Sequence, residues 1–333
     1  MMNKNKTPQE SQRSKAEREW QLNQLKQDEE FNKWVARKYH LTAIQLETLF
    51  KAGYVKIKNN ETVSARQMVE YYQEEQNVKD SINELDTQDV DVDDLRTKIN
   101  DRVSVLKATS MINQKEHLKS LMGLKLVLLG TILTVGVCKK LSKDAKAEIT
   151  RQKELNFQLA PEHKSKPKKR KAFGFFHKSH DIWDSRWIKK QIYENTKRQN
   201  FSDAIWSDID QLKARLDSVL VRSIANGESN QKTATKFTYL VRKDIENQKY
   251  VTERVARTES AKVEFQVQWS LAKSQGFKYV QWHAEPGACK TCQGISEATP
   301  TNYGEGVYKI DDVPDIPVHP CCRCSIGTYY PDV

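Results

Sequence analysis

The sequence predicts a mainly α-helical protein that ends in a small α+β module, whose short strands are held together by a Cys/His cluster. Three observations support this fold class. Only 12 glycines and 9 prolines occur among the 333 residues, which disfavours a turn-rich β fold. Apolar side chains recur at helical spacing through most of the chain. The pattern becomes strand-like after Gly276, just ahead of five of the six cysteines.

The length suggests about two domains, at roughly 150 residues per domain. Composition divides the chain more finely. We expect a charged helical N-terminal region over residues 1–105 and a hydrophobic helix with a basic linker over 106–180. A C-terminal domain is expected over 181–333, with the Cys/His module at 277–330.

The first hundred residues predict helices separated by short breaks. Residues 1–31 are polar and of mixed charge, so we expect a solvated helix or a frayed tail with almost nothing to bury. From Phe31 onward apolar residues follow helical spacing, until Gly53 interrupts and residues 54–57 favour a short strand or a turn. A second helical pattern follows Thr62, and the acidic stretch over 80–94 predicts a loop, or a weak helix followed by a loop.

A long helical stretch is expected from Leu95, and it contains the most hydrophobic window of the chain, residues 121–138. A membrane span needs about 20 apolar residues. This window is shorter and contains Lys125, so a buried helix of an α-helical core is favoured over a membrane anchor.

The clearest helix start lies at residues 200–206, where Ser202 fits an N-cap and Asp203 suits the first turn. Asn226-Gly227 predicts its end. A second helix is expected around Phe237–Ile245, and a third from about Val251 to Gln275.

Positive charge is concentrated in the middle third of the chain. Residues 101–200 carry 23 basic and 9 acidic side chains, which suggests a polyanionic partner. The densest run is KSKPKKRK at 164–171. Its basic side chains are candidates for contact with DNA phosphates, and the alternative is a solvated boundary between halves. These candidates are Lys164, Lys166, Lys168, Lys169, Arg170 and Lys171.

The cysteine spacing favours a metal site. The N-terminus has no secretory pattern, so a reducing cytosol is expected, where paired cysteines indicate metal ligands more often than disulfides. Cys289 and Cys292 form a CxxC pair, the usual turn for tetrahedral zinc. Two further ligands would come from His319, Cys322 and Cys324, and Cys321 is a further candidate. Four protein ligands would make a structural Zn²⁺ site, and the alternative is a set of reduced or redox-reactive thiols.

Several motifs of the C-terminal half occur in a characteristic order. They are NFSDAIW at 200–206, ARTES at 256–260, YVQW at 279–282, CKTC at 289–292 and PVHPCCRC at 317–324. In this order they resemble the phage head morphogenesis, or minor head protein, family with its phage Mu protein F-like domain. The resemblance covers about residues 181–330 and rests, besides the ligands, on Arg257, Thr258, Glu259, Trp282, Pro320 and Arg323. The chain departs from the family pattern at Glu285, where an aspartate is usual, at Ile316 and at Cys321.

The resemblance implies a minor head protein of a tailed phage or prophage that acts in head morphogenesis at the portal vertex, and in DNA packaging or ejection by binding portal or capsid and DNA. Implied partners are the portal protein, capsid or scaffold proteins, and double-stranded DNA bound without sequence specificity; a membrane is not expected. The implied location is the host cytoplasm during assembly and then the virion head. No enzymatic activity is firmly attached to this domain.

Three other functions remain open at this point. A zinc-dependent hydrolase or nuclease would need an open metal position and a nearby base such as His283, Glu285 or Glu259. A sequence-specific zinc DNA-binding protein is disfavoured because the segment around the cysteines has almost no excess of basic residues. A membrane-anchored protein would use residues 121–138.

Overall fold

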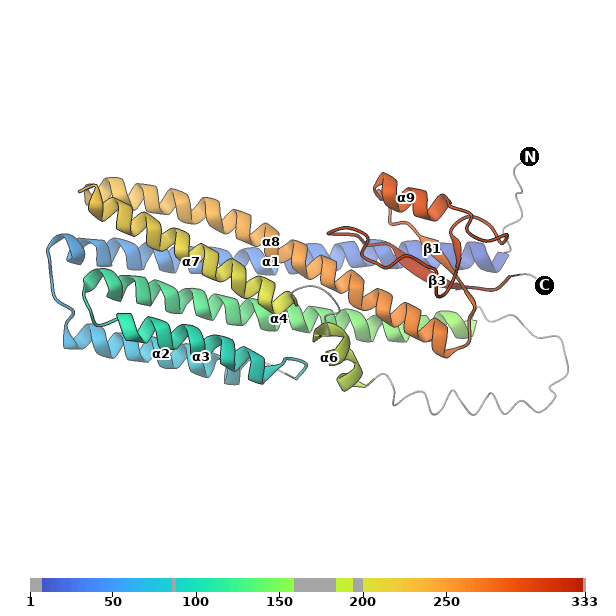
Figure 1. Ribbon diagram of the computed structural model, residues 1–333, viewed down its shortest axis with the longest axis horizontal. Coiled ribbons are helices and arrows are strands. Elements are labelled where there is room, and N and C mark those ends of the chain that lie inside the picture. Colours follow the sequence, from blue (N-terminus) through green and yellow to red (C-terminus); the bar gives the residue numbers. More distant parts are fainter. Residues whose placement is uncertain (1–7, 86–87, 159–183, 194–199, 332–333) are drawn as a thin grey trace. The chain divides into compact units, whose positions relative to one another are not determined.

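The structure is a computed structural model that describes residues 8–85, 88–158, 184–193 and 200–331 (Figure 1). Over these residues the fold is mainly helical, with a small antiparallel sheet near the C-terminus and a Cys/His cluster beside it, so the predicted fold class is confirmed. The helices are α1 (Pro8–Lys58), α2 (Ala65–Glu84), α3 (Val92–Thr109), α4 (Gln114–Gln158), α6 (Ser185–Tyr193), α7 (Phe201–Ala225), α8 (Asn230–Ser274) and α9 (Lys290–Glu297). The strands are β1 (Tyr279–His283), β2 (Val307–Lys309) and β3 (Ser325–Tyr329).

The chain forms two compact units, each assembled from segments that are distant in sequence. The first, which we call the sheet unit, comprises Met1–Glu30, Lys140–Glu194 and Arg254–Val333. The second, the helix unit, comprises Phe31–Lys139 and Asn195–Glu253. The sequence suggested contiguous regions instead, because composition does not show that α1, α4 and α8 each contribute to both units.

The helix unit has an apolar core to which α1, α4, α7 and α8 contribute. Phe50 of α1 is fully buried and stacks on Phe237 of α8, with 3.7 Å between ring centroids. Trp206 of α7 is also buried. The hydrophobic window of α4 lies in this unit, and 72% of the window is buried. Lys125, within that window, pairs with Glu74 at 2.5 Å, so its charge is compensated. By length and composition alone, α4 is the one helix among the described residues that could cross a membrane.

The expected interruption of α1 at Gly53 is wrong, since the helix continues to Lys58. Here the glycine serves packing: a Cβ at Gly53 would lie 2.8 Å from a methyl group of Leu118 on α4. Because glycine has no side chain, it permits close contact between α1 and α4 at this position. The hydrogen bonds of α1 continue through it.

Two other expected helix boundaries are also corrected. The long helix expected from Leu95 breaks at residues 110–113, because the Asn113 side chain caps a new helix by accepting from Glu116 N at 3.0 Å. The N-cap of α7 is Asn200, whose Oδ1 accepts from Asp203 N at 2.8 Å. Ser202 is buried and accepts from Lys98 instead. The predicted end at Asn226-Gly227 is confirmed.

The two helices expected over 230–275 are one continuous helix, α8. No glycine or proline occurs between Asn230 and Ser274, so no residue there breaks the helix. Its last part lies in the sheet unit, where it covers the β-sheet with Ala261, Phe265 and Ala272.

The sheet of the sheet unit has the order β2-β1-β3, with both pairs antiparallel. Val280 and Trp282 of β1 and Ile326 of β3 join α8 in a small apolar cluster. On the outer edge of β3, the Ile326 N–H donates to the Gln268 side chain of α8 at 2.9 Å, which satisfies an edge group that would otherwise need a further strand.

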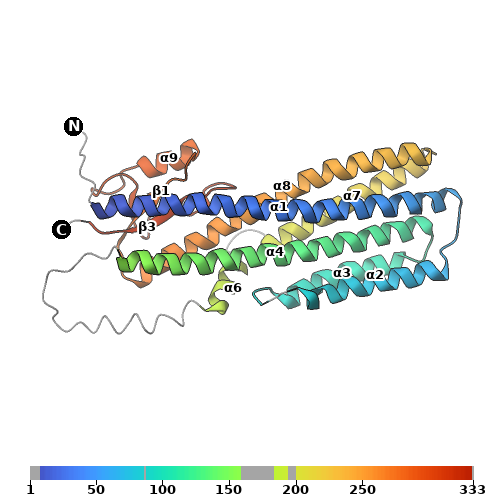
Figure 2. The same cartoon turned by 180° about the vertical axis from the view of Figure 1, so that it is seen from behind.

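The expectation that residues 1–31 have almost nothing to bury is wrong for the described part. The helix begins at Pro8, and in the sheet unit it runs beside α4 (Figure 2). What it buries there is polar, at positions that keep helical spacing. These residues are Arg13, Glu17, Gln21, Gln24 and Asp28, which are 0–6% exposed.

The polar stripe of α1 continues in phase into the apolar core of the helix unit. Arg13 and Gln24 are eleven residues apart, and the same interval leads on to Val35 and Leu46. An eleven-residue repeat corresponds to three helical turns, so these positions lie on one face of α1. The face therefore stays buried while its chemistry changes from polar to apolar.

Candidate metal centre

The five metal ligands expected from the sequence come from two segments of the sheet unit. Cys289 is the N-cap residue of α9, and Cys292 lies in the first turn of that helix. His319 and Cys322 precede β3, and Cys324 adjoins its first residue. The CxxC pair therefore lies at the start of a helix, where the first backbone N–H groups have no acceptor within the helix.

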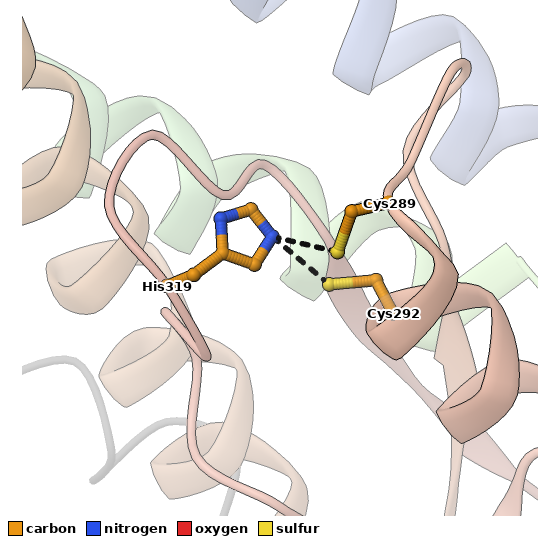
Figure 3. Close-up of side chains that lie close together, drawn as sticks. All are labelled: Cys289, Cys292 and His319. Carbon is orange, nitrogen blue, oxygen red and sulfur yellow. Dashed lines mark hydrogen bonds between the residues drawn. The ribbon is translucent and has the colours of Figure 1, made fainter.

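The donor atoms are close enough to share a metal ion. His319 Nε2 lies 3.3 Å from the sulfurs of both Cys289 and Cys292 (Figure 3). The sulfurs of Cys292 and Cys322 are 3.9 Å apart. Tetrahedral zinc ligands lie roughly 3.5–3.8 Å from one another, given metal–sulfur distances of ~2.3 Å and metal–nitrogen distances of ~2.0 Å. The observed distances are therefore close to those of a metal centre.

The donors form two overlapping groups of three. One contains Cys289, Cys292 and His319, and the other contains Cys292, Cys322 and Cys324. Within each group all donor atoms lie within 4.8 Å of one another. Cys292 belongs to both groups and is fully buried, whereas Cys289 is exposed. This cluster could hold a metal ion, with its buried side formed by Cys322 and Cys324.

The His319 ring is oriented for ligation through Nε2. Its Nδ1 lies 2.9 Å from the Pro320 carbonyl oxygen. A carbonyl only accepts, so Nδ1 carries the proton and the lone pair remains on Nε2, which faces the two sulfurs. This is the tautomer that a metal-binding histidine needs, and backbone hydrogen bonds commonly fix it.

The thiols of the cluster differ in pKa. A hydrogen bond from the Cys324 thiol lowers the pKa of Cys322 to about 5. Burial raises the pKa of Cys292 to about 12. A hydrogen bond from the Cys292 backbone lowers the pKa of Cys289. A cluster with some thiols ionised and others held neutral is one that a divalent cation would stabilise.

Arg323 lies between two candidate ligands and is almost fully buried. Its Nε and Nη2 donate to the two oxygens of Asp28 at 2.9 and 2.5 Å. Nη1 donates to Ser260 at 2.9 Å and to Glu264 at 3.0 Å. Its backbone N–H donates to Glu285 at 3.0 Å. A buried guanidinium with this many partners fixes the backbone on which Cys322 and Cys324 lie.

Some of the remaining motif residues belong to the hydrogen-bond network around Arg323, and others lie outside it. Arg257 donates to Glu285 at 2.9 Å, and Thr258 Oγ1 accepts from the Cys321 backbone at 3.0 Å. Glu259 instead pairs with Lys262 on its own helix. Trp282 packs in the apolar cluster beneath the sheet.

Two of the bases that a hydrolytic metal site would need are held by cations. Glu285 pairs with the Arg257 guanidinium and also accepts from the Arg323 backbone N–H, although burial raises its pKa. Glu259 is paired with Lys262. His283 lines a cavity of about 410 Å³ together with Arg18 and Gln21, and the residues that line it include none of the five candidate metal ligands.

The candidate DNA-phosphate residues over 164–171 lie outside the described residues. The nearby helix α6 is described, and it buries Ile188 and Ile192 while Arg186 is exposed.

Sequence reasoning missed the residues that hold the network from α1, α4 and α8. Asp28 and Glu264 are the clearest examples, because both contact Arg323. Asp28 could have been found from helical spacing, because the polar positions before Phe31 lie on the same helix face as the apolar positions after it. Comparisons with family models, curated proteins and solved structures found no match to this chain.

Proposed function

We propose that this chain is a minor head protein of a tailed phage or prophage, in which the C-terminal module is a metal-stabilised docking element. One observation carries the proposal. Motif residues that are up to 67 positions apart in the sequence, from Arg257 to Cys324, meet around one network.

We further propose that the metal is Zn²⁺ and that its role is structural. Thiolate and imidazole donors suit zinc, and four of the five donors would close its tetrahedron. The module has a small apolar cluster and three short strands, so a metal would supply stability that its core lacks. Glu285 and Glu259 are already paired with Arg257 and Lys262, which favours a structural over a hydrolytic site.

The zinc assignment is tested by the metal content of the full-length chain, measured by mass spectrometry after purification without added metal. We expect about one zinc per chain. The double variant Cys289→Ser/Cys292→Ser should lose it. The control is Cys138→Ser, because Cys138 is a buried cysteine of the helix unit that bonds to the Asp89 carbonyl. A chain that contains no zinc, or a double variant that retains it, contradicts the assignment.

The docking role is tested by co-expression with the portal protein encoded nearby, followed by size-exclusion chromatography. We expect the full-length chain to co-elute with the portal protein. The Cys289→Ser/Cys292→Ser variant should co-elute less, while Cys138→Ser should behave like the wild type. Absence of co-elution for a folded wild-type chain would contradict the portal role.

The DNA role depends on the basic run and is tested separately. Replacement of Lys168, Lys169, Arg170 and Lys171 by alanine should reduce retention on double-stranded DNA at low salt without changing helicity. Wild-type binding should weaken steeply as salt increases, because counterions are released when phosphates are neutralised. Unchanged DNA affinity of the variant at low salt would contradict a phosphate contact by this run.

A further inference from the structure

The N-terminal part of α1 docks in the sheet unit through polar contacts. Between residues 12 and 30, every side chain classed as buried is polar or charged. The half-buried Trp20 ring lies against Arg151, with 4.8 Å between the guanidinium carbon of Arg151 and the centroid of the Trp20 ring. Burial of apolar surface, the usual driving force for helix docking, therefore contributes little here.

One set of contacts joins this segment to α4. Arg13 donates to Asn156 and to Gln152, both at 2.9 Å. Glu17 accepts from Arg151 at 2.9 Å. These contacts pair polar groups along the helix, and exposing them to water would cost less than exposing an apolar face of the same size.

A second set joins the segment to the C-terminal module. Gln21 donates to the His283 carbonyl oxygen at 3.0 Å and to Ser325 Oγ at 3.1 Å. Ser325 Oγ in turn donates to Glu17 at 3.1 Å. The bidentate pair of Asp28 with Arg323 is the strongest of these contacts, because both partners are charged, buried and aligned.

Asp28 therefore reaches the metal centre through one residue. Arg323 is flanked in the chain by Cys322 and Cys324, so its backbone moves with the loop that carries both sulfurs. If a metal fixes this loop, it also fixes the guanidinium that receives Asp28. If Asp28 is removed, the buried guanidinium loses its bidentate partner and the loop loses a constraint.

We propose that metal binding by the cysteine cluster and docking of residues 8–30 are coupled through the Arg323–Asp28 pair. The N-terminal segment acts as a strap that is held when the metal is bound and loosened when it is absent. This inference rests on the proposed zinc centre. Linkage requires the effect to be reciprocal, so loss of the Asp28 contact must weaken metal binding by the same factor by which metal favours that contact.

The test uses the full-length chain and the variant Asp28→Asn, with Glu29→Gln as the matched control. Glu29 is the next residue on the same helix and is exposed. Zinc affinity is measured by competition with a chromophoric chelator. We expect Asp28→Asn to weaken zinc binding about 10- to 100-fold, as residues that support metal ligands typically do, and Glu29→Gln to leave it unchanged.

Hydrogen exchange of the wild-type chain with and without zinc provides the reciprocal measurement. Removal of zinc should speed exchange in peptides from residues 12–30 at least tenfold, while peptides around Phe50 in the helix unit keep their protection. Circular dichroism establishes that Asp28→Asn remains folded, and Asp28→Glu, which keeps the carboxylate, should recover part of the affinity.

Two results would overturn the coupling while leaving the zinc centre intact. One is equal zinc affinity for Asp28→Asn and Glu29→Gln. The other is equal exchange of residues 12–30 with and without zinc in a wild-type chain that binds zinc. A wild-type chain that binds no zinc would overturn the proposed metal centre itself and, with it, the coupling.

Discussion

The two parts of helix α1 bury the same face with opposite chemistry. In the helix unit this face presents Val35, Tyr39, Leu46, Phe50 and Tyr54, none more than 1% exposed. In the sheet unit it presents the polar stripe from Arg13 to Asp28. Helix α4 changes in part: a buried polar stripe follows its apolar window 121–138, while Leu141, Ala145 and Ile149 are buried there as well. That second stripe comprises Lys140, Asp144, Glu148, Gln152 and Asn156.

The difference shows that burial and hydrophobicity are separate properties of a helix face. An apolar core stabilises through surface removed from water, at about 25 cal/mol per Å². A buried polar network gains little net free energy, because desolvation offsets most of the attraction between its charges. Such a network instead requires one particular set of partners. In the sheet unit those partners align α1, α4, α8 and the loop that carries Arg323.

The largest expected effect tests the apolar core of the helix unit. Replacement of Phe50 by alanine removes a fully buried ring that stacks on Phe237. We expect a loss of about 3–5 kcal/mol in the free energy of unfolding, measured by urea titration. Val105→Ala is the control, because Val105 is 68% exposed and should change stability by less than about 0.5 kcal/mol. A small loss at Phe50 would mean that this core is not well packed.

The second effect concerns the pH dependence of the sheet unit. Burial raises the pKa of Glu264 from 4.5 to about 8, so the folded chain keeps a proton that the unfolded chain releases. The contribution of Glu264 to stability is therefore fully present below pH 4.5 and is lost as the pH rises toward 8, with a slope of at most ~1.4 kcal/mol per pH unit.

Glu264→Gln keeps a neutral side chain at all pH values, so it should remove this part of the slope. Urea titrations at pH 6 and pH 8, with zinc present, measure the difference. Glu246→Gln is the control on the same helix, because the Glu246 side chain is 69% exposed. If Glu264→Gln and the wild type lose stability equally, Glu264 is ionised throughout this range.

A third, smaller effect has the opposite sign. Both polar atoms of the Gln24 side chain are buried and have no hydrogen-bond partner among the described residues. Gln24→Leu should therefore stabilise the chain by about 1–2 kcal/mol, because an unsatisfied amide is replaced by an apolar side chain of similar size. Asn23→Leu, at the neighbouring exposed position, should have little effect in the same urea titration. Destabilisation by Gln24→Leu would indicate that Gln24 does have a partner in solution.

The smallest effect tests a local signal in the helix unit. Ser64 forms a capping box with Gln67 at the start of α2. Ser64→Ala should cost about 1 kcal/mol, measured as a shift in the thermal unfolding midpoint, while Ser64→Thr keeps the hydroxyl and should cost less. Equal effects of the two substitutions would show that the cap does not contribute.

Much of the metal site could be predicted from the sequence, whereas most of its support could not. The CxxC spacing and the HPxCRC segment identified all five donors, because short-range spacing determines which side chains share a turn. Asp28, Ser260 and Glu264 contact Arg323 across separations of 59–295 residues. Spacing within a motif carries no information about partners so far away.

The sequence by itself determined the helical class, the short strands near the C-terminus and the candidate ligands, since helical periodicity, scarce glycine and cysteine spacing are local properties. Only the tertiary structure decided that the polar face formed by Arg13, Glu17, Gln21, Gln24 and Asp28 is buried. A polar helix face indicates solvent when read alone. It becomes a core when α4, α8 and β3 offer complementary charges and hydrogen-bond partners, and that complementarity exists only once distant segments have come together.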